Sequence, residues 1–331
     1  MYYVGVDLHK KQSWFYVMDQ GGTKISSKSI ANSKEQLNRY FAAIPKPFKL
    51  AVESTYNWYF FVDMAEIYAD KVYLANSYEL KAFAKRHKKT DRIDARLIAD
   101  ILRKGYLPTV TIPDKDTRNI KEVLRYRMNI VKDRSRNIYR LKALFDKLGN
   151  TCTGSLTTYK RLEELKQINY PSEYKYIFLG YIEKLTFLTE KLRDIDQYIR
   201  SVFGKDPDID NLRSIPGIDY FSAALIKSEI IDINRFATFN RLCAYAGLAP
   251  RVHQSANKLI RGSLNVNRRK NLQWILIEIV YHFIRALPDK TDKYNNIKKR
   301  RGSNVAKVSL ARDMLKIVYH ILKDKRKFSF A

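Results

Sequence analysis

The sequence predicts an α/β domain with a mixed sheet and flanking helices, followed by a long helical hairpin and a mostly α-helical C-terminal region. Three observations predict this arrangement. The first 30 residues read as strands, the next 70 alternate helical and strand patterns, and apolar residues after Pro113 repeat with helical spacing. Each element follows from its local pattern.

Five short segments near the N-terminus have the composition of strands, being rich in aromatic and β-branched residues. A Gly-Gly turn signal separates the second from the third. The expected strands are residues 2–9, 13–19, 24–30, 48–53 and 71–75.

Helices are expected between and after these strands. Ser33 is suited to cap a helix that runs to about residue 43, where two prolines stop it. A second helix is expected over 57–68, and Ser77 is expected to cap a third. Thr90 or Asp91 caps a fourth, which runs to about residue 103.

Two long helices are predicted beyond Pro108 and Pro113, with a polar break at 151–158. The first carries Arg127 and Arg134 on its apolar seam. The second has eight apolar heptad positions, which is typical of a coiled coil. Both an antiparallel hairpin within one chain and a dimerisation arm fit this pattern. The heptad residues are Phe178, Tyr181, Leu185, Leu188, Leu192, Ile195, Ile199 and Val202.

The C-terminal region starts with a pattern that resembles a helix-hairpin-helix at residues 212–218, in which the backbone around Gly217 would face a nucleic-acid phosphate. An ordinary helical turn is the alternative. Downstream, we expect a helix near 241–246, a loop at 247–262, a helix at 268–286, and two basic helices over 290–327 broken near 302–303. The expected domains are 1–110, 111–205 and 206–331.

The formal net charge of +28 indicates a polyanionic partner, most simply nucleic acid. The charge is concentrated in two zones, residues 81–142 with net +12 and residues 251–331 with net +15. No apolar run is long enough to span a bilayer, and no signal peptide is evident. Two cysteines and five scattered histidines favour a reducing compartment and argue against a structural zinc site.

Four carboxylates have the placement of a two-metal site. Asp7 and Glu53 end strands, and Asp91 and Asp94 lie three apart at the start of a helix. Mg²⁺ prefers a few carboxylates together with phosphate oxygens, and two such ions stabilise both oxygens of a phosphoryl displacement. Each of these four carboxylates could instead have a structural role, as a turn residue, a helix cap or an ion-pair partner. Asp7 interrupts an apolar run, where an ionised group is costly without a ligand.

Five collinear motifs resemble the DEDD transposases of the insertion-sequence-110 family. Residues 5–10 (Gly-Val-Asp-Leu-His-Lys), 53–59 and 89–95 (Lys-Thr-Asp-Arg-Ile-Asp-Ala) are similar to its N-terminal motifs. Residues 215–218 and 244–250 resemble its C-terminal transposase domain.

The resemblance implies a RuvC-like N-terminal domain of RNase H-type fold that binds Mg²⁺ or Mn²⁺ through Asp7, Glu53, Asp91 and Asp94. It also implies a nucleophilic serine, for which Ser255 has the right place. The implied activity is DNA transposition or recombination guided by the element's structured non-coding RNA, performed by a homodimer or homotetramer in the prokaryotic cytoplasm, at the nucleoid. This sequence departs from the family pattern at Tyr56, at Ala256 and in the basic stretch after Gly262.

Basic residues near the motifs are expected to contact DNA or RNA phosphates. Two other functions remain open: a RuvC-like nuclease that hydrolyses DNA with water, and a nucleic-acid-binding protein without catalysis. The expected contact residues are Lys88, Lys89, Arg92, Arg96, Gly217, Lys258, Arg261, Arg268, Arg269 and Lys270.

Overall fold

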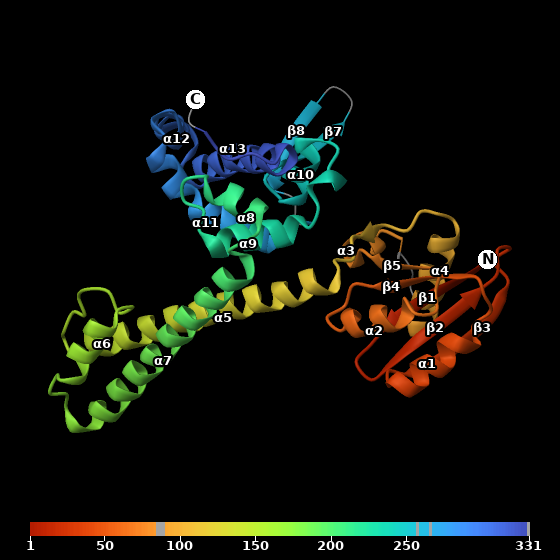
Figure 1. Cartoon of the computed structure of the whole chain (residues 1–331), viewed down its shortest axis with the longest axis horizontal. Coiled ribbons are helices and arrows are strands. Elements are labelled where there is room, and N and C mark those ends of the chain that lie inside the picture. Colours follow the sequence, from red (N-terminus) through yellow and green to blue (C-terminus); the bar gives the residue numbers. More distant parts are fainter. Residues whose placement is uncertain (84–89, 256–257, 265–266, 330–331) are drawn as a thin grey trace. The chain divides into compact units, whose positions relative to one another are not determined.

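The computed structural model describes residues 1–83, 90–255, 258–264 and 267–329, and over 251–263 it describes the backbone alone. The chain divides into two compact units, Met1–Pro113 and Asp114–Ala331 (Figure 1). The first unit ends at Pro113, three residues beyond the expected end of the first domain at residue 110. A further division near residue 205 stays a prediction.

The first unit contains a six-stranded mixed sheet with the order β3-β2-β1-β4-β5-β6. β1, β4 and β5 run parallel, whereas β2, β3 and β6 pair antiparallel with their neighbours. The five expected strands are confirmed, and this sheet is consistent with an RNase H-like domain. The strands are β1 (Tyr2–Leu8), β2 (Gln12–Met18), β3 (Lys24–Ala31), β4 (Phe48–Glu53), β5 (Lys71–Ala75) and the two-residue β6 (Thr109–Val110).

Helices cover both faces of this sheet, because successive side chains of β1 point to opposite sides. Val4, Val6 and Leu8 belong to a core cluster with residues of α1 and α2. The other face carries α4, whose Ala95 and Ala99 pack with residues of β2. The helices are α1 (Lys34–Ala43), α2 (Trp58–Ala65), α3 (Ser77–Leu80) and α4 (Asp91–Arg103).

The helix starts follow the capping residues of the sequence, with one exception. Ser33 caps α1 by accepting the Gln36 backbone N–H, as predicted. Thr90 caps α4 by accepting the Ile93 N–H. The cap of α3 is Asn76 rather than Ser77, because the Asn76 carboxamide oxygen accepts the Tyr78 N–H.

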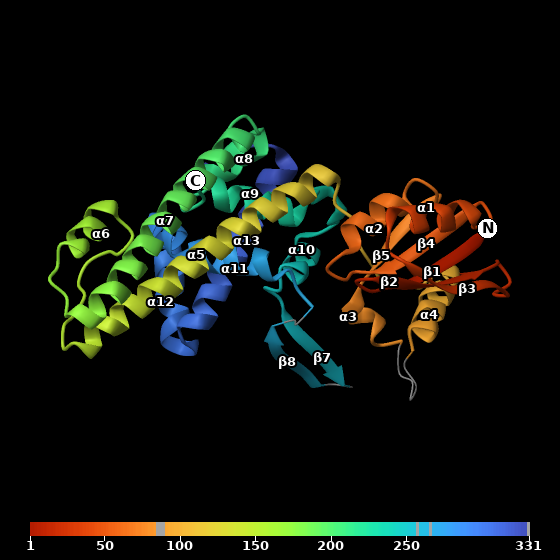
Figure 2. The same cartoon turned by 90° about the horizontal axis from the view of Figure 1, so that it is seen from below.

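The second unit begins with two long helices, α5 (Lys115–Lys147) and α7 (Ser172–Phe203), which pack against each other (Figures 1 and 2). They run antiparallel. The early α5 residues Leu124 and Met128 share a cluster with the late α7 residue Ile199, and late α5 residues pack with early α7 residues. The helices therefore pair within one chain. Whether they form a coiled coil stays a prediction.

One of the two arginines on the α5 seam, Arg127, is compensated by the opposite helix. Arg127 Nε donates to Asp196 Oδ1 at 3.0 Å, and its guanidinium lies 4.0 Å from the Phe221 ring centroid. A half-buried arginine is tolerated at an apolar seam when its charge is paired and its plane stacks on an aromatic ring. This pairing explains how an intrachain hairpin accommodates Arg127.

The tip of the hairpin has its own small core. The short helix α6 (Tyr159–Lys166), which the sequence pattern did not predict, contributes Leu162 and Leu165. These residues pack with Phe145 and Phe178, from the ends of α5 and α7 nearest the tip. The tip is thus buried separately from the larger core of the second unit.

The rest of the second unit is a helical bundle from which a two-stranded hairpin projects (Figures 1 and 2). The two basic helices predicted over 290–327 are confirmed and separate at Gly302, which has a φ of 85°. The expected loop at 247–262 is wrong, because two strands lie there. The elements are α8 (Pro207–Arg213), α9 (Tyr220–Ile230), the 3-10 helix η1 (Ile233–Arg235), α10 (Phe239–Tyr245), β7 (Pro250–Ser255), β8 (Lys258–Leu264), α11 (Lys270–Ala286), α12 (Pro288–Arg301) and α13 (Ser303–Asp324).

Among the residues that the structure describes, none of the helices combines the length and the apolar character that crossing a membrane requires.

Candidate active site

The two strand-end carboxylates lie at the same edge of the sheet. β1 and β4 are parallel and Val6 is opposite Val52, so Asp7 and Glu53 follow at the same level on neighbouring strands. Asp7 is only 8% exposed and Glu53 is half-buried. Because carboxyl ends of parallel strands meet at one edge, this register brings the two side chains together.

The other two carboxylates come from the first turn of α4, which contains Asp91 and Asp94. Gly5 allows α4 to lie directly on β1. A Cβ on Gly5 would be 2.1 Å from the Ala95 carbonyl oxygen and 2.4 Å from the Ala99 backbone nitrogen. Since Gly5 and Asp7 are two apart on β1, they face the same side. The missing side chain at position 5 therefore brings the start of α4 to Asp7.

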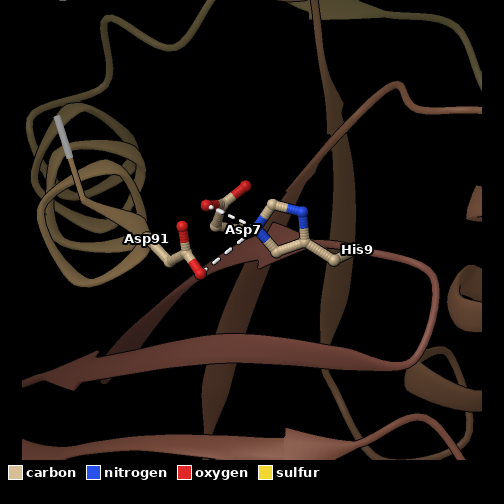
Figure 3. A group of neighbouring side chains, drawn as sticks. All are labelled: Asp7, His9 and Asp91. Carbon is tan, nitrogen blue, oxygen red and sulfur yellow. Dashed lines mark ion pairs between the residues drawn. The ribbon is translucent and has the colours of Figure 1, made fainter.

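A histidine joins the cluster. His9 Nε2 lies 3.2 Å from Asp7 Oδ2 and 3.4 Å from Asp91 Oδ2, and Figure 3 shows one nitrogen of the imidazole facing both carboxylates. The His9 backbone carbonyl accepts side-chain N–H bonds from Asn32 at 2.7 Å and Asn57 at 2.8 Å. Two amides from different segments thus fix the residue that follows β1.

Electrostatics distinguish Asp7 from an ordinary surface acid. Burial raises the pKa of Asp7, and the nearby carboxylates of Asp91, Asp94 and Glu53 raise it further, whereas His9 opposes them. Ligand atoms of Asp7, His9 and Asp91 all lie within 4.8 Å of one another. Such a group of mostly hard oxygen donors, with excess negative charge, fits a divalent cation. The cluster is therefore a candidate metal site.

The basic residues expected near this cluster are only partly described. Arg92 and Arg96 are exposed on the first two turns of α4. Lys88 and Lys89 lie outside the described residues. Exposure leaves the two arginines accessible to a phosphate, and their role stays a prediction.

The residues expected around the serine lie on and after the β7–β8 hairpin. Ser255 is the last residue of β7 and is opposite Lys258, the first residue of β8, which also contains Arg261. The side chains of these three residues lie outside the described part of the structure. Their roles therefore stay predictions.

A buried polar cluster lies where the chain leaves the hairpin. Glu229 on α9 pairs with Lys121 of α5, with Nζ 3.4 Å from Oε2, and each side chain is 5% exposed. Asn271 at the start of α11 donates to Glu229 Oε1 at 3.2 Å. The Glu229 backbone carbonyl accepts the Tyr245 hydroxyl at 3.0 Å, and that hydroxyl accepts Arg269 Nε at 2.7 Å. The segment before the hairpin, at Tyr245, and the segment after it, at Arg269 and Asn271, are therefore both linked to Glu229 by hydrogen bonds.

Three other predicted contact residues have described surroundings. Arg268 packs its side chain against Gly247, where a Cβ would be 2.4 Å from Arg268 Cδ. Lys270 is exposed at the start of α11. Gly217 has a φ of 90°, and a Cβ at this position would be only 2.7 Å from the Cβ of His282 on α11. Its phosphate contact stays a prediction, but packing alone requires glycine there.

Sequence reasoning missed two members of these clusters, His9 and Glu229. His9 stands in the quoted motif, two residues after Asp7, but a lone histidine there carries no signal for a metal ligand. Glu229 lies inside an apolar helix, and a charge in such a run was the available signal.

Comparisons with known proteins agree with this arrangement. One family model, described as a transposase with a DEDD motif of the IS110 type, matches residues 4–149, and a second, described as the transposase IS116/IS110/IS902 family, matches residues 209–295. The transposase for insertion sequence element IS1111A of Coxiella burnetii is 27% identical over 259 residues, which cover 75% of this chain and 70% of that protein. The transposase for insertion sequence element IS1328 of Yersinia enterocolitica is 22% identical and covers 98% of both chains.

The two matched stretches contain the elements of both clusters, since the first spans β1, β4 and α4 and the second spans Glu229 and the β7–β8 hairpin. Two independent family models in the expected order, together with full-length relatives, leave one conclusion. The chain belongs to the IS116/IS110/IS902 family of insertion-sequence transposases, and it is a DNA transposase.

Proposed function

We propose that the protein cuts and rejoins the DNA of its insertion sequence by phosphoryl transfer, using a Mg²⁺ or Mn²⁺ site made by Asp7, Glu53, Asp91 and Asp94 and a nucleophile on Ser255. The observation that carries the proposal is the convergence of β1, β4 and the start of α4 on a negatively charged cluster around the buried Asp7. Membership of a transposase family supplies the substrate, DNA.

The carboxylates hold the cation, and His9 orients two of them. A divalent cation bound there would act as a Lewis acid on phosphoryl oxygens. The His9 imidazole contacts both Asp7 and Asp91, so it limits how far the two side chains can turn. Asn32 and Asn57 keep the His9 backbone in place.

Ser255 takes part in two successive phosphoryl transfers, first from DNA to its hydroxyl and then back to DNA. Its Oγ attacks a DNA phosphorus, the Oγ–P bond forms and the bond to the departing DNA oxygen breaks. The departing oxygen takes up a proton as a hydroxyl end, and the serine proton passes to solvent. Attack by a DNA hydroxyl on the serine-linked phosphate then rejoins the strand and regenerates Ser255.

Guidance by the element's structured RNA and assembly into a dimer or tetramer complete the proposal. The chain has two separate basic zones, and each can neutralise the phosphates of a polyanion. This charge supports an RNA partner in addition to DNA. The size of the assembly in solution is measured by light scattering with and without RNA.

A serine variant tests the nucleophile. Incubated with element DNA and the flanking RNA, the protein should form a protein–DNA adduct that survives denaturing electrophoresis. Ser255→Ala should abolish the adduct and the rejoined product, whereas Ser263→Ala, a serine on β8 of the same hairpin, should retain both. Cutting by Ser255→Ala without an adduct would instead indicate a water-using nuclease.

A binding measurement tests the metal site separately from catalysis. Mn²⁺ binding followed by electron paramagnetic resonance should be lost in Asp7→Asn and retained in Asp63→Asn, a change on α2 of the same unit. Equal Mn²⁺ binding by both variants would contradict the assignment. Loss of Mn²⁺ binding with strand transfer intact would remove the metal from the mechanism.

A further inference from the structure

A cavity of about 470 Å³ lies in the second unit, between α12, α13 and the segment after α13. It shares no residue with the carboxylate cluster or the β7–β8 hairpin. Most of its lining lies beyond residue 295, where the family match ends.

Two walls of the cavity are faces of helices. On α13, Asp313, Lys316 and His320 are three and four residues apart, so they lie along one side of the helix. On α12, Lys290 and Lys293 are likewise three apart. Lysines therefore lie on both of these helices, which pack against each other.

The third wall is the segment after α13, and several contacts hold it in place. Lys325 ends α13 in a left-handed conformation with a φ of 52°, which turns the chain. Its Nζ lies 2.7 Å from Asp208 Oδ1, and Lys327 Nζ lies 2.7 Å from Asp210 Oδ2. The Phe328 backbone N–H donates to Ser214 Oγ at 2.7 Å. These contacts hold the third wall of the cavity in place.

Cations outnumber acids in the lining, although three of these cations pair with carboxylates outside it: Lys290 with Asp289, Arg326 with Asp324 and Lys327 with Asp210. Five lining residues are Lys or Arg, and Asp313 is the only acid among the lining residues that the structure describes. Lys293 pairs with Asp313 at 2.7 Å. Lys316 is exposed, and no carboxylate of the described residues lies within ion-pair distance of its Nζ. The floor is apolar, formed by Ile317, Ile321 and Phe328.

We propose that this cavity binds the phosphodiester backbone of a nucleic-acid strand, as a contact separate from the two catalytic clusters. Lysine side chains on two helices, together with Arg326 on the segment after α13, suit a chain of phosphates. Contacts to phosphates position a strand without depending on its base sequence. A volume of about 470 Å³ admits more than a single phosphate group, and the apolar floor suits the adjoining sugars. The strand is DNA or the RNA, which share this chemistry.

The test is a binding titration of the full chain without divalent ions, so its outcome does not depend on Ser255 or on a metal. The probes are a fluorescein-labelled DNA duplex of arbitrary sequence and a labelled RNA stem-loop, each followed by anisotropy over a NaCl series. The double variant Lys316→Ala/Arg326→Ala removes two exposed charges from the cavity. We expect binding of one or both probes to weaken roughly 10-fold, with the salt slope falling by about 1 for each phosphate that the protein no longer neutralises.

The matched control is Lys160→Ala/Lys175→Ala, which removes the same charge from exposed positions outside both basic zones. A loss confined to the duplex assigns the strand as DNA, and a loss confined to the stem-loop assigns it as RNA. If the cavity variant loses no more affinity or salt slope than the control on either probe, the inference is wrong.

A substitution that should strengthen nucleic-acid binding provides a second test. Asp313→Asn removes the acid from the lining and releases Lys293, so binding should tighten a few-fold. Asp194→Asn on α7, an exposed acid, changes the net charge equally. Equal tightening in the two variants would indicate a general charge effect and would also overturn the inference.

Discussion

Two buried carboxylates in this protein have opposite surroundings. Asp7 lies among three other acids, with His9 as its nearest basic group. Glu229 instead contacts the Lys121 ammonium and the Asn271 amide, so its charge has a partner of opposite sign. Both belong to segments that match the transposase family.

The difference separates a binding site from a scaffold. A buried charge is tolerated when the protein supplies its partners, as it does for Glu229. For Asp7, the His9 imidazole stands against three neighbouring acids, and this imbalance costs stability unless a cation binds. The contrast also explains why Glu229 suits a structural role at the base of the hairpin, whereas Asp7 suits a ligand.

The largest expected effect comes from uncoupling the Glu229 pair. Glu229→Gln leaves the buried Lys121 ammonium without a countercharge, and burial already lowers the pKa of that lysine. The free energy of unfolding measured in urea should fall by about 3–5 kcal/mol. Glu163→Gln, which breaks an exposed pair with Lys166, should cost about 1 kcal/mol or less.

A double variant separates charge from shape. Lys121→Met in the Glu229→Gln background should recover most of the lost stability, because neither charge then remains buried. If the double variant were as unstable as the sum of the two single changes, the pair would not be the source of the effect.

The next effect concerns the contact that assembles the acidic cluster. Gly5→Ala places a Cβ against the Ala95 carbonyl and Ala99 nitrogen, which are backbone atoms that cannot rotate away. Unfolding should become easier by roughly 1–3 kcal/mol or more. Mn²⁺ affinity should also fall, because Asp91 moves away from Asp7. Gly180→Ala on α7 has open space and should be neutral or slightly stabilising.

A smaller effect of opposite sign is expected at Asp7. Asp7→Asn relieves like-charge crowding, so in metal-free buffer near neutral pH the variant should be more stable than the natural protein, by about 1 kcal/mol. Added Mn²⁺ should raise the melting temperature of the natural protein and leave the variant unchanged. A destabilised variant would place Asp7 with Glu229 as a structural acid.

The smallest effect tests a third acid, Asp208 on α8, which pairs with Lys325 after α13. Burial raises its pKa, but hydrogen bonds from Lys325 and Lys227 outweigh burial, and the pKa is held below its usual 3.8. A lowered pKa means a stabilising contribution that is complete above the usual value and is lost as the pH falls through the folded-state value. Asp208→Asn should therefore cost about 1 kcal/mol or less at pH 7.

Acid denaturation provides the check. The stability difference between Asp208→Asn and the natural protein should shrink below about pH 4. A difference that persists unchanged into acid would mean that packing, not charge, accounts for the contribution of Asp208.

Local signals in the sequence were sufficient for most of the first unit. Alternating apolar strands, the Ser33 cap and the Asp91–Asp94 spacing depend on neighbours in the chain, and the structure agrees with each. Gly5 is different, because its role depends on α4, some 90 residues later. No local pattern indicates that approach.

The misses share a dependence on distant partners. The β7–β8 hairpin lies in a basic stretch without a glycine turn between its strands, so its pairing had no local signal. The Lys121–Glu229 pair joins residues 108 positions apart. His9 becomes part of the acidic cluster only when α4 brings Asp91 to it.

The separate core at the tip of the α5–α7 hairpin makes this arm a module of variable length. Its apolar cluster closes without residues from the bundle, and the antiparallel pair returns the chain to its starting point. Removing or adding matched turns in both helices would change the reach of the arm and leave the bundle with the same contacts. The length of this spacer can therefore be engineered in this protein independently of the acidic cluster.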